Sequence, residues 1–359
     1  MKEIVFILSS LCDPHYRKRV EEFVEQGYKV TVYGFSRDGQ SIQTFPCNPI
    51  VLETISNRSY VNRLSLFRKK IKSIAKECRN KVCFYSSLDI ALFARLYIKS
   101  NYIYEICDLT ELTIQNPILR NYLIHCNKKT IKKSQLTIMT SEGFVEFYDD
   151  VPLDKIVIVP NKVSGQNIKP INVNRGISNS HKVRIGFVGV IRFETIYNFI
   201  KVVAETLCNV EVHLYGIYSE GDCFAEKIKQ IEATSDKVFY HGAFSNPVDL
   251  PQIYSQIDLL MCTYTPSPGV VYAEPNKLYE AMFFKCPIVV NSGTFLARKV
   301  ERLGIGYIVD ATLESDIEML LSNITPESYS EKIAHCNLIP ETECLNINNH
   351  LFEKLRQVL

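Results

Sequence analysis

A lysine, an amide and a carboxylate stand close together in the segment EPNKLYEAMFFKCPIVVN, residues 274–291. Pro275 favours the first turn of a helix, because its missing N–H would lack a partner there in any case. The free amides of that turn and the charge of Lys277 would attract an anion, above all a phosphate. Glu280 follows Asn276 by four residues, so both side chains project from one helix face. We therefore predict that these groups converge on one ligand.

Three further candidates lie in loops that follow predicted strands in the first half of the chain. Asp108 ends the strand YIYEICD, where an α/β domain presents catalytic groups, and it could act as a general base or orient a hydroxyl group. It could equally cap the following helix, since Asp is favoured at that position. Asp13 and His15 lie in the loop SSLCDPH after the first strand, and His15 is a weaker candidate for a base.

Apolar strands and amphipathic helices alternate along the chain and would position these residues. KEIVFIL, a helix that Gly27 ends, and YKVTVYGF form the first strand, helix and strand unit. Strands such as PIVVN show no alternation of polar residues, as is typical of a parallel sheet covered by helices on both faces. The pattern predicts an α/β protein with doubly wound, Rossmann-like sheets.

The chain of 359 residues is long enough for two domains, since single cores seldom grow beyond roughly 250 to 300 residues. The polar stretch over residues 166–181 has no period and predicts a linker. We expect an N-terminal domain over residues 1–165, a C-terminal domain over 182–335 and a helical segment over 336–359. Two tandem Rossmann-like domains imply a ligand cleft between the carboxyl ends of their strands.

The composition excludes several classes of protein. The sequence has no run of 18 uncharged apolar residues, and we expect its first apolar segment to be a strand and not a signal peptide. Its 12 cysteines are scattered without zinc-type spacing, which favours reduced thiols in the cytoplasm and predicts no metal site. The GxGxxG motif of dinucleotide folds, the P-loop and the Gly-x-Ser-x-Gly elbow are also absent.

Charge is shared unevenly along the chain. Residues 1–165 contain 24 Lys and Arg against 17 Asp and Glu, whereas the remainder contains 17 against 22. The basic half could face anionic lipid or an anionic acceptor, or it could simply have ordinary solvated faces. The predicted helix over residues 61–79 combines an apolar stripe with cations that include Arg68, Lys69, Lys70, Lys72, Lys76 and Arg79. It could lie on a membrane surface, but such a stripe more often faces a protein core. A peripheral position on the inner membrane face is one expectation; no nucleic-acid partner is expected.

Several motifs resemble those of glycosyltransferases with the GT-B fold. FVGVIR, YHGAF, IYSQIDLLMCTY, PNKLYEAMFFKCPIVV and ERLGIGYIVD occur in the order and spacing of the family 4 (group 1) enzymes of capsular and surface-polysaccharide assembly. The likeness is strong over residues 184–310. It is weaker in the first half, where it rests on GYKVTVYG, YEICDL, SEGF and VIVPNK. The resemblance implies metal-independent transfer of a sugar from a nucleotide-diphosphate donor, such as a UDP- or GDP-sugar, to a saccharide or lipid-linked acceptor.

The resemblance also implies roles for individual residues. Glu280 matches the glutamate that binds the donor ribose, and Arg192 matches an arginine that grips the diphosphate. Tyr272 and Tyr197 stand where the family often has a second glutamate and a lysine, so Glu274 and Lys277 are candidate replacements. The remaining candidates are Gly189, where the backbone can approach the donor closely, and Ser141 and Gly143, which belong to the acceptor side.

Two alternatives to a transferase remain open at this point. A sugar-nucleotide epimerase of the same fold would change the nucleotide-sugar without an acceptor. A non-catalytic, sugar-nucleotide-binding subunit would explain the tyrosines at positions 272 and 197.

Overall fold

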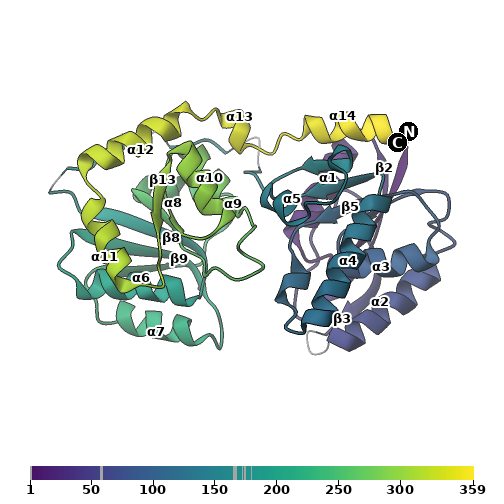
Figure 1. Cartoon of the computed structure of the whole chain (residues 1–359), viewed down its shortest axis with the longest axis horizontal. Helices are drawn as coiled ribbons and strands as arrows, with labels where there is room; N and C mark the ends of the chain where they lie inside the picture. The colour runs from purple at the N-terminus through teal and green to yellow at the C-terminus, as the bar shows by residue number, and fades with distance from the viewer. Residues whose placement is uncertain (1, 57–59, 165–167, 172, 174, 179) are drawn as a thin grey trace. The chain divides into compact units, whose positions relative to one another are not determined.

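The chain folds into two compact α/β units in a computed structural model that describes residues 2–56, 60–164, 168–171, 173, 175–178 and 180–359. Unit 1 comprises Met1–Pro160 together with Asn348–Leu359, and unit 2 comprises Asn161–Ile347 (Figure 1). Each unit has one parallel sheet with helices on both faces, so the predicted pair of doubly wound sheets is confirmed.

The sheet of unit 1 has seven strands in the order β3-β2-β1-β4-β5-β6-β7. Its strands are β1 (Glu3–Leu8), β2 (Lys29–Arg37), β3 (Ile50–Ile55), β4 (Val82–Tyr85), β5 (Tyr102–Ile106), β6 (Leu136–Met139) and β7 (Ile156–Ile158). All neighbouring strands are parallel, so their carboxyl ends lie at one edge. The strand order reverses between β1 and β4. Ligands of doubly wound sheets bind at such a reversal.

Helices cover both faces of this sheet. They are α1 (Pro14–Glu25), α2 (Tyr60–Ile74), α3 (Leu88–Tyr97), η1 (Thr110–Thr113), α4 (Pro117–Lys133), α5 (Gly143–Phe147), η2 (Leu153–Lys155) and α14 (Asn349–Val358). The polar side chains of Asp13, Ser87 and Asn116 accept backbone N–H bonds at the starts of α1, α3 and α4, which explains where these helices begin. Figure 1 shows α1 and α14 on one face and α2, α3 and α4 on the other.

The apolar stripe of α2 faces the core of unit 1. Phe67, Ile71 and Ile74 are buried, and Cys78 beyond the helix is buried as well. The stripe is therefore not available to a membrane, which contradicts that interpretation of the predicted helix. Its cations lie on the outer side, where Arg68, Lys69, Lys72, Lys76 and Arg79 are exposed.

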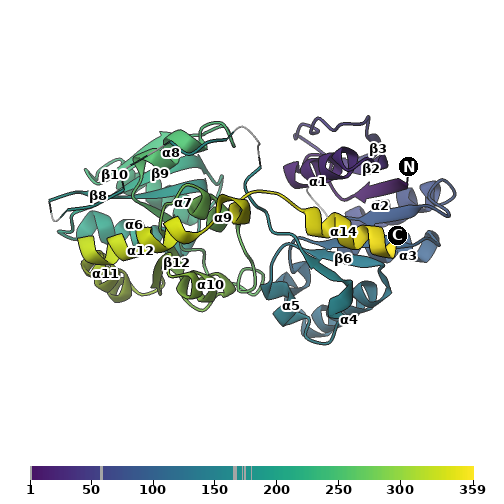
Figure 2. The ribbon, with the colours of Figure 1, turned by 90° about the horizontal axis from the view of Figure 1, so that it is seen from above.

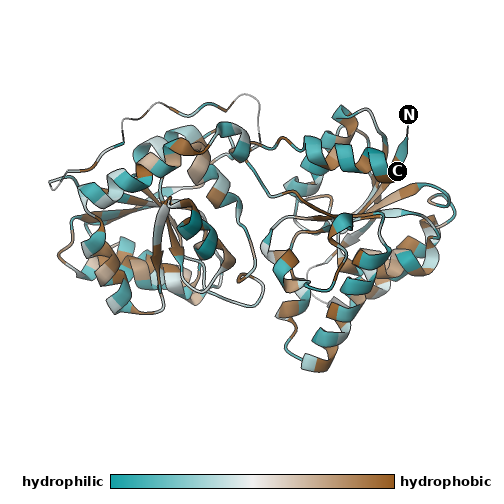
Figure 3. Cartoon of the chain, turned by 45° about the horizontal axis from the view of Figure 1, so that its top comes forward, coloured by the Kyte–Doolittle hydropathy of each residue, from teal (hydrophilic) through white to brown (hydrophobic). Residues whose placement is uncertain are grey.

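Unit 2 has a six-stranded parallel sheet in the order β10-β9-β8-β11-β12-β13. The strands are β8 (Val183–Ile191), β9 (Val210–Tyr218), β10 (Val238–Gly242), β11 (Leu259–Cys262), β12 (Ile288–Asn291) and β13 (Gly306–Val309). The helices are α6 (Glu194–Glu205), α7 (Cys223–Glu232), α8 (Leu250–Gln256), α9 (Asn276–Phe283), α10 (Phe295–Leu303), α11 (Glu314–Asn323), α12 (Pro326–Leu338) and α13 (Glu341–Cys344). Here the strand order reverses between β8 and β11. Figure 3 shows hydrophobic central strands beneath helices whose outer sides are hydrophilic.

The observed division differs from the expected boundaries at both ends of unit 2. Unit 2 begins at Asn161, because Val163 pairs with Leu345 in an isolated parallel bridge. The predicted C-terminal segment over 336–359 is divided, since α14 packs against unit 1 (Figures 1 and 2). Leu351, Phe352 and Leu355 of this helix join the apolar cluster beneath β1 and α1, which explains its position.

Candidate functional site

The start of α9 in unit 2 brings the predicted lysine, amide and carboxylate together. The carboxylate of Glu280 accepts hydrogen bonds from Asn276 Nδ2, Lys277 Nζ and Tyr254 Oη, each at 2.8 Å. Lys277 and Glu280 are both buried, so each charge compensates the other. Pro275 occupies the N-cap position, one residue earlier than expected, and the first amides of α9 follow it.

Glu274 is held away from this group by other partners. Its Oε2 atom accepts hydrogen bonds from Lys299 Nζ at 2.7 Å and from Tyr279 Oη at 2.5 Å, and its side chain is buried. These contacts tie the segment before α9 to α10 and to α9 itself. They favour a structural role for Glu274 over the expected contact with a donor sugar.

The loop after β8 presents a second cation of unit 2. Arg192 is exposed, and its guanidinium lies 4.6 Å from the ring centroid of Phe193 without an ion-pair partner among the described residues. Phe193 has φ 80°, an unusual backbone conformation for a bulky residue, and it begins α6. Strained residues of this kind concentrate at ligand sites. Tyr197, where a lysine was expected from the resemblance, lies one turn later beneath Lys227, whose Nζ is 5.1 Å from its ring centroid.

Gly189 belongs to the same strand end and is paired with Gly216 of β9. A Cβ atom on Gly216 would lie 1.7 Å from the carbonyl oxygen of Gly189, so these two strands can approach only without a side chain there. Gly189 itself has φ 148°, which favours glycine, and a Cβ atom there would meet only the ring of Phe187, at an ordinary contact distance of 3.9 Å. The glycine pair therefore shapes the backbone that leads to Arg192.

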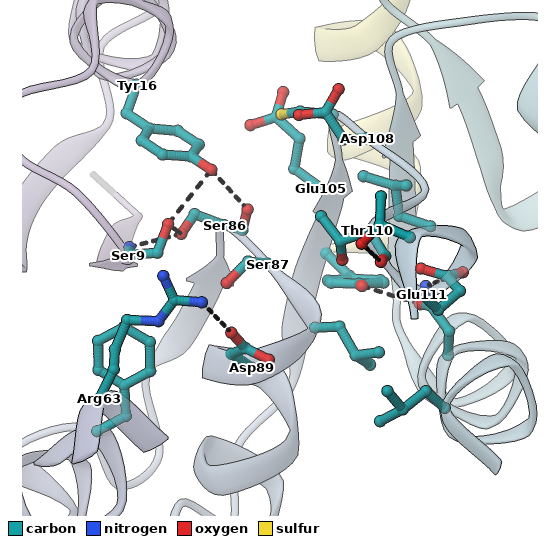
Figure 4. A pocket seen from close by; sticks show the side chains of 18 of the residues that line it. Ser9, Tyr16, Arg63, Ser86, Ser87, Asp89, Glu105, Asp108, Thr110 and Glu111 are labelled. Carbon is teal, nitrogen blue, oxygen red and sulfur yellow. Dashed lines mark hydrogen bonds and ion pairs between the residues drawn. The ribbon is translucent and has the colours of Figure 1, made fainter. Parts of the chain in front are cut away.

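A pocket of about 470 Å³ opens at the strand reversal of unit 1 (Figure 4). Ser9 follows β1 and Ser86 follows β4, and a hydrogen bond of 2.8 Å joins Ser9 N to Ser86 Oγ. Tyr16 Oη donates a hydrogen bond to the Ser86 carbonyl at 2.9 Å. The pocket also has guanidinium and carboxylate groups, supplied by Arg37, Arg63, Asp89, Glu105, Asp108 and Glu111. Hydroxyl, cationic and anionic groups in one pocket suit a polar, hydroxylated ligand.

Asp108 lies at this pocket, directly after β5, and its side chain is exposed. It does not cap η1, whose N-cap is Leu109, and it has no hydrogen-bond partner among the residues that the structure describes. Desolvation by the surrounding protein raises the pKa of Asp108, with His15 opposing this change and Asp13 adding to it. An accessible carboxylate with a raised pKa is suited to accept a proton from a substrate hydroxyl.

His15 belongs to a buried ion-pair network behind Asp108. Its Nε2 atom lies 3.1 Å from Glu105 Oε1 and 3.3 Å from Cys107 Sγ, and Arg19 donates two hydrogen bonds to the same Glu105 oxygen, at 2.8 and 3.0 Å. Burial alone would raise the pKa of Glu105, but Arg19 and His15 hold it at about 2.

The same network decides the protonation of His15. Burial opposes the charge of the imidazolium, but the neighbouring Cys107 and Glu105 outweigh this effect and raise the pKa of His15 well above its ordinary value. Burial raises the pKa of the Cys107 thiol to about 11, so Glu105 carries the negative charge at neutral pH. A protonated imidazole cannot accept a proton. The structure therefore favours a charged, positioning role for His15 instead of the expected base.

His15, Glu105 and Cys107 offer ligand atoms within 4.8 Å of one another, a spacing that a metal ion can bridge. Two N–H groups of Arg19 already bind the Oε1 atom of Glu105, and a guanidinium at that distance repels a cation. The arrangement favours an ion-pair network over a metal centre.

The remaining sequence candidates have local structural roles. Asp13 caps α1 by accepting a hydrogen bond from His15 N at 2.9 Å. Ser141 and Gly143 are buried, and Gly143 N donates to Ser141 Oγ at 3.1 Å within the turn before α5. Neither of these two residues lines the pocket of unit 1, so the structure does not support their expected contact with an acceptor.

Sequence reasoning missed several polar residues of the pocket. Glu105 was detectable as the single charge within the apolar strand YIYEI, but its partner Arg19 is 86 residues away. Arg37 and Glu111 gave no local signal, since one ends a strand and the other lies in a short 3-10 turn. Their significance depends on the strand order, which brings distant loops to one edge.

Two Rossmann-like units of this kind, each with one parallel, doubly wound sheet, are the architecture of the GT-B fold of glycosyltransferases. Residues 182–323 match the family model described as glycosyl transferases group 1. The chain is 23% identical over 374 residues to the succinoglycan biosynthesis protein ExoL of Rhizobium meliloti, with 96% of this chain and 92% of that protein covered.

Solved structures show the same architecture over the whole chain. Sucrose-phosphate synthase from Thermosynechococcus elongatus superposes with a TM-score of 0.71 at 14% identity, and 100% of each chain is covered. HepE of Anabaena, solved in complex with UDP and glucose, superposes with a TM-score of 0.68 at 14% identity, covering 99% of this chain and 100% of HepE. The protein is therefore a glycosyltransferase of the GT-B fold, and its match to the group 1 family model lies within unit 2.

Proposed function

We propose that unit 2 binds a nucleotide-diphosphate sugar, such as a UDP- or GDP-sugar. The exposed guanidinium of Arg192 and the first amides of α9 are suited to the diphosphate, because a helix N-terminus and an unpaired cation both favour anions. Glu280 can accept hydrogen bonds from ribose hydroxyls, while Lys277 compensates its buried charge. The UDP bound by HepE, a protein of the same fold, supports this assignment.

Unit 1 binds the acceptor in this proposal. An acceptor hydroxyl oxygen forms a bond to the anomeric carbon of the donor sugar as the bond to the nucleoside diphosphate breaks. Asp108 accepts or orients the hydroxyl proton, and the diphosphate leaves with the bonding electrons. The negative charge that develops on the leaving oxygen requires fixed cations and helix amides, which unit 2 supplies.

The acceptor is a saccharide or a lipid-linked saccharide of surface-polysaccharide assembly. The match to ExoL, a succinoglycan biosynthesis protein, over nearly the full length of both chains supports this class of product. None of the described helices is long and apolar enough to cross a membrane. A lipid-linked acceptor would instead be reached by peripheral binding of unit 1 at the membrane surface, for which the exposed cations of α2 and the exposed apolar side chains of α4 are suited.

The observation that carries the donor assignment is the unpaired Arg192 beside the strained Phe193, and it can be tested by substitution. Arg192→Ala should lower kcat/KM for the nucleotide-sugar roughly 100- to 1,000-fold, because it removes one donor to the developing charge. Lys229→Ala, at a half-exposed lysine of α7 that pairs with Glu226 at 2.7 Å, is the control and should leave kcat/KM unchanged. Thermal unfolding should be nearly the same for both variants and the wild type, since Arg192 is exposed and has no ion-pair or hydrogen-bond partner in the described part of the chain.

Lys277→Ala and Glu280→Ala should each weaken nucleotide binding as well, but with a loss of stability, because each leaves a buried charge uncompensated. Full activity in all three variants would refute the donor assignment. Product analysis by NMR separates the alternatives: an epimerase would change the nucleotide-sugar without an acceptor, and a binding subunit would bind it without transfer or hydrolysis.

A further inference from the structure

The pocket of unit 1 contains a buried carboxylate whose charge is not compensated by a cation. Glu111 lines the pocket and is only 2% exposed. Its Oε1 atom accepts hydrogen bonds from Asn127 Nδ2 at 3.1 Å and from the Tyr148 hydroxyl, and both partners are neutral. Its Oε2 atom has no partner among the described residues. A buried acceptor oxygen without a hydrogen bond is unfavourable, so it favours binding of a ligand that supplies a hydrogen-bond donor.

A hydrogen-bond chain fixes the orientation of Glu111. Tyr104 Oη donates to Asn127 Oδ1 at 2.8 Å, and Asn127 Nδ2 donates to Tyr148 Oη at 2.6 Å as well as to Glu111. Every group in this chain has its partner except the second oxygen of Glu111. The network therefore holds one acceptor oxygen ready, as a site for sugar hydroxyl groups requires.

The opposite side of the pocket carries two guanidinium groups. Figure 4 shows Arg63 across the pocket from Glu111, with Ser87 and Asp89 between them. Arg63 Nη2 lies 3.6 Å from Asp89 Oδ2, whereas the half-buried Arg37 has no ion-pair or hydrogen-bond partner for its side chain among the described residues. Desolvation and the nearby charge of Arg63 lower the pKa of Arg37. Two guanidiniums that sense each other's charge, of which only Arg63 lies near the carboxylate of Asp89, favour an anion as a ligand.

We propose that this pocket binds the phosphorylated end of the acceptor, with Arg37 and Arg63 on the phosphate and Glu111 on the sugar hydroxyl groups. The proposal rests on the assignment of unit 1 to the acceptor, and it specifies the acceptor's chemistry: a sugar that carries a phosphate or diphosphate. A pocket of about 470 Å³ has room for a hexose and its phosphate.

Binding measured by calorimetry tests this without requiring catalysis. The parent protein is the Arg192→Ala variant, in which a phosphorylated ligand binds the donor site weakly and which should be as stable as the wild type. The ligands are the 1-phosphates of glucose, galactose, mannose and N-acetylglucosamine, the four free sugars, and inorganic phosphate. At least one hexose 1-phosphate should bind more tightly than the free sugar and than inorganic phosphate, which distinguishes a phosphorylated sugar from an unspecific anion site.

Variants added to this parent then separate the two halves of the pocket. Arg37→Ala should weaken the hexose 1-phosphate about tenfold and leave the free sugar unchanged, because one charged hydrogen-bonding group is lost. Glu111→Gln should weaken both ligands about tenfold. Lys69→Ala, an exposed cation of α2, is the control for general loss of charge and should change neither. Arg37→Lys, which keeps the charge, should restore part of the lost affinity.

The proposal is overturned if no hexose 1-phosphate binds the parent protein, or if Arg37→Ala and Glu111→Gln both bind as the parent does. Thermal unfolding shows whether Glu111→Gln is still folded. If it is not, Arg37→Ala is the decisive variant, because Arg37 is only half-buried. Failure here leaves the donor experiments on Arg192 unaffected, so the two proposals fail separately.

Discussion

Two aspartates in similar loops of unit 1 have different roles because their surroundings differ. Asp13 and Asp108 each follow a parallel strand at the same edge of the sheet. Asp13 is engaged by the first turn of α1, whereas Asp108 precedes a 3-10 turn that it does not cap. Only Asp108 keeps an accessible carboxylate, so the local helix geometry, and not the residue type, decides which of them can meet a substrate.

The raised pKa of Asp108 leads to a prediction for the pH dependence of transfer. The carboxylate must be ionised to accept a proton, so kcat should fall as the pH falls through its pKa. The pKa of an ordinary Asp is about 3.9. Because the pKa of Asp108 is raised, kcat should begin to fall at a higher pH than it would with an ordinary Asp. Asp108→Asn should lower kcat roughly 100-fold or more and remove this acidic limb, with the KM for the nucleotide-sugar unchanged.

Asp13→Ser is the matched control for this measurement: serine also caps a helix, so the activity and the acidic limb should both persist, with the limb moved to a lower pH because Asp13 adds to the raised pKa of Asp108. An acidic limb that persists in Asp108→Asn would assign the titration to another group.

At the scale of elements, α14 is part of unit 1 although the whole of unit 2 precedes it in the sequence. Its buried face packs against β1, α1 and β7 in the apolar cluster of unit 1. Polar bonds add to this contact: Asn348 Nδ2 donates to Glu22 Oε1 at 3.0 Å, and Lys354 Nζ donates to the Ile156 carbonyl at 3.1 Å. The last helix therefore stabilises the unit that carries the pocket at Asp108.

Leu355→Ala should destabilise unit 1 and leave unit 2 unchanged. Leu355 is fully buried, and removal of a buried leucine side chain costs about 2 to 5 kcal/mol. Hydrogen exchange followed by mass spectrometry can resolve the two units. In the variant, amide exchange should be faster in peptides from β1 and α1, and it should be unchanged in peptides from β8 and β12. Gln357→Ala, on the exposed face of the same helix, should behave as the wild type. Equal acceleration in both units would show that α14 stabilises the chain as a whole.

The sequence predicted the strands and helices of both units better than it predicted which elements pack against each other. Alternating apolar strands and amphipathic helices predicted the parallel sheets, because a fully buried strand needs a continuous apolar run. The spacing of Leu351, Leu355 and Val358 predicted a helix, but no local pattern encodes that it returns to unit 1. Strand β3 was missed since it lies at a sheet edge, where Ile50 and Val51 are exposed and the apolar pattern is weak.

The candidate site shows the same limit. Lys277, Asn276 and Glu280 were predictable because they share two turns of one helix, where spacing alone determines proximity. The group of Arg19, His15 and Glu105 joins loops and strands that only the strand order brings together.

At the scale of the whole molecule, charge is divided between the units. Unit 1 contains 25 basic and 18 acidic residues, while unit 2 contains 16 and 21. Helices α2, α3 and α4 lie side by side on one face of unit 1, as Figures 1 and 2 show. Large apolar side chains are exposed on this face: Ile118 and Tyr122 of α4 are 81% and 62% exposed, and Leu96 of α3 is 68% exposed. Cations beside exposed apolar side chains suit an anionic membrane surface.

Unit 1 should therefore bring the protein to anionic vesicles in a salt-dependent manner. The protein should sediment with phosphatidylglycerol vesicles at low ionic strength and be released at about 1 M salt, where the screening length falls to about 3 Å. Ile118→Asp should reduce the bound fraction at low salt, because it places a negative charge among the side chains that would enter the interface. Leu207→Asp is the matched control, since Leu207 is a fully exposed apolar residue of unit 2, and it should bind as the wild type. Equal binding to neutral phosphatidylcholine vesicles, or equal losses in the two variants, would exclude α4 and its neighbours as the contact surface.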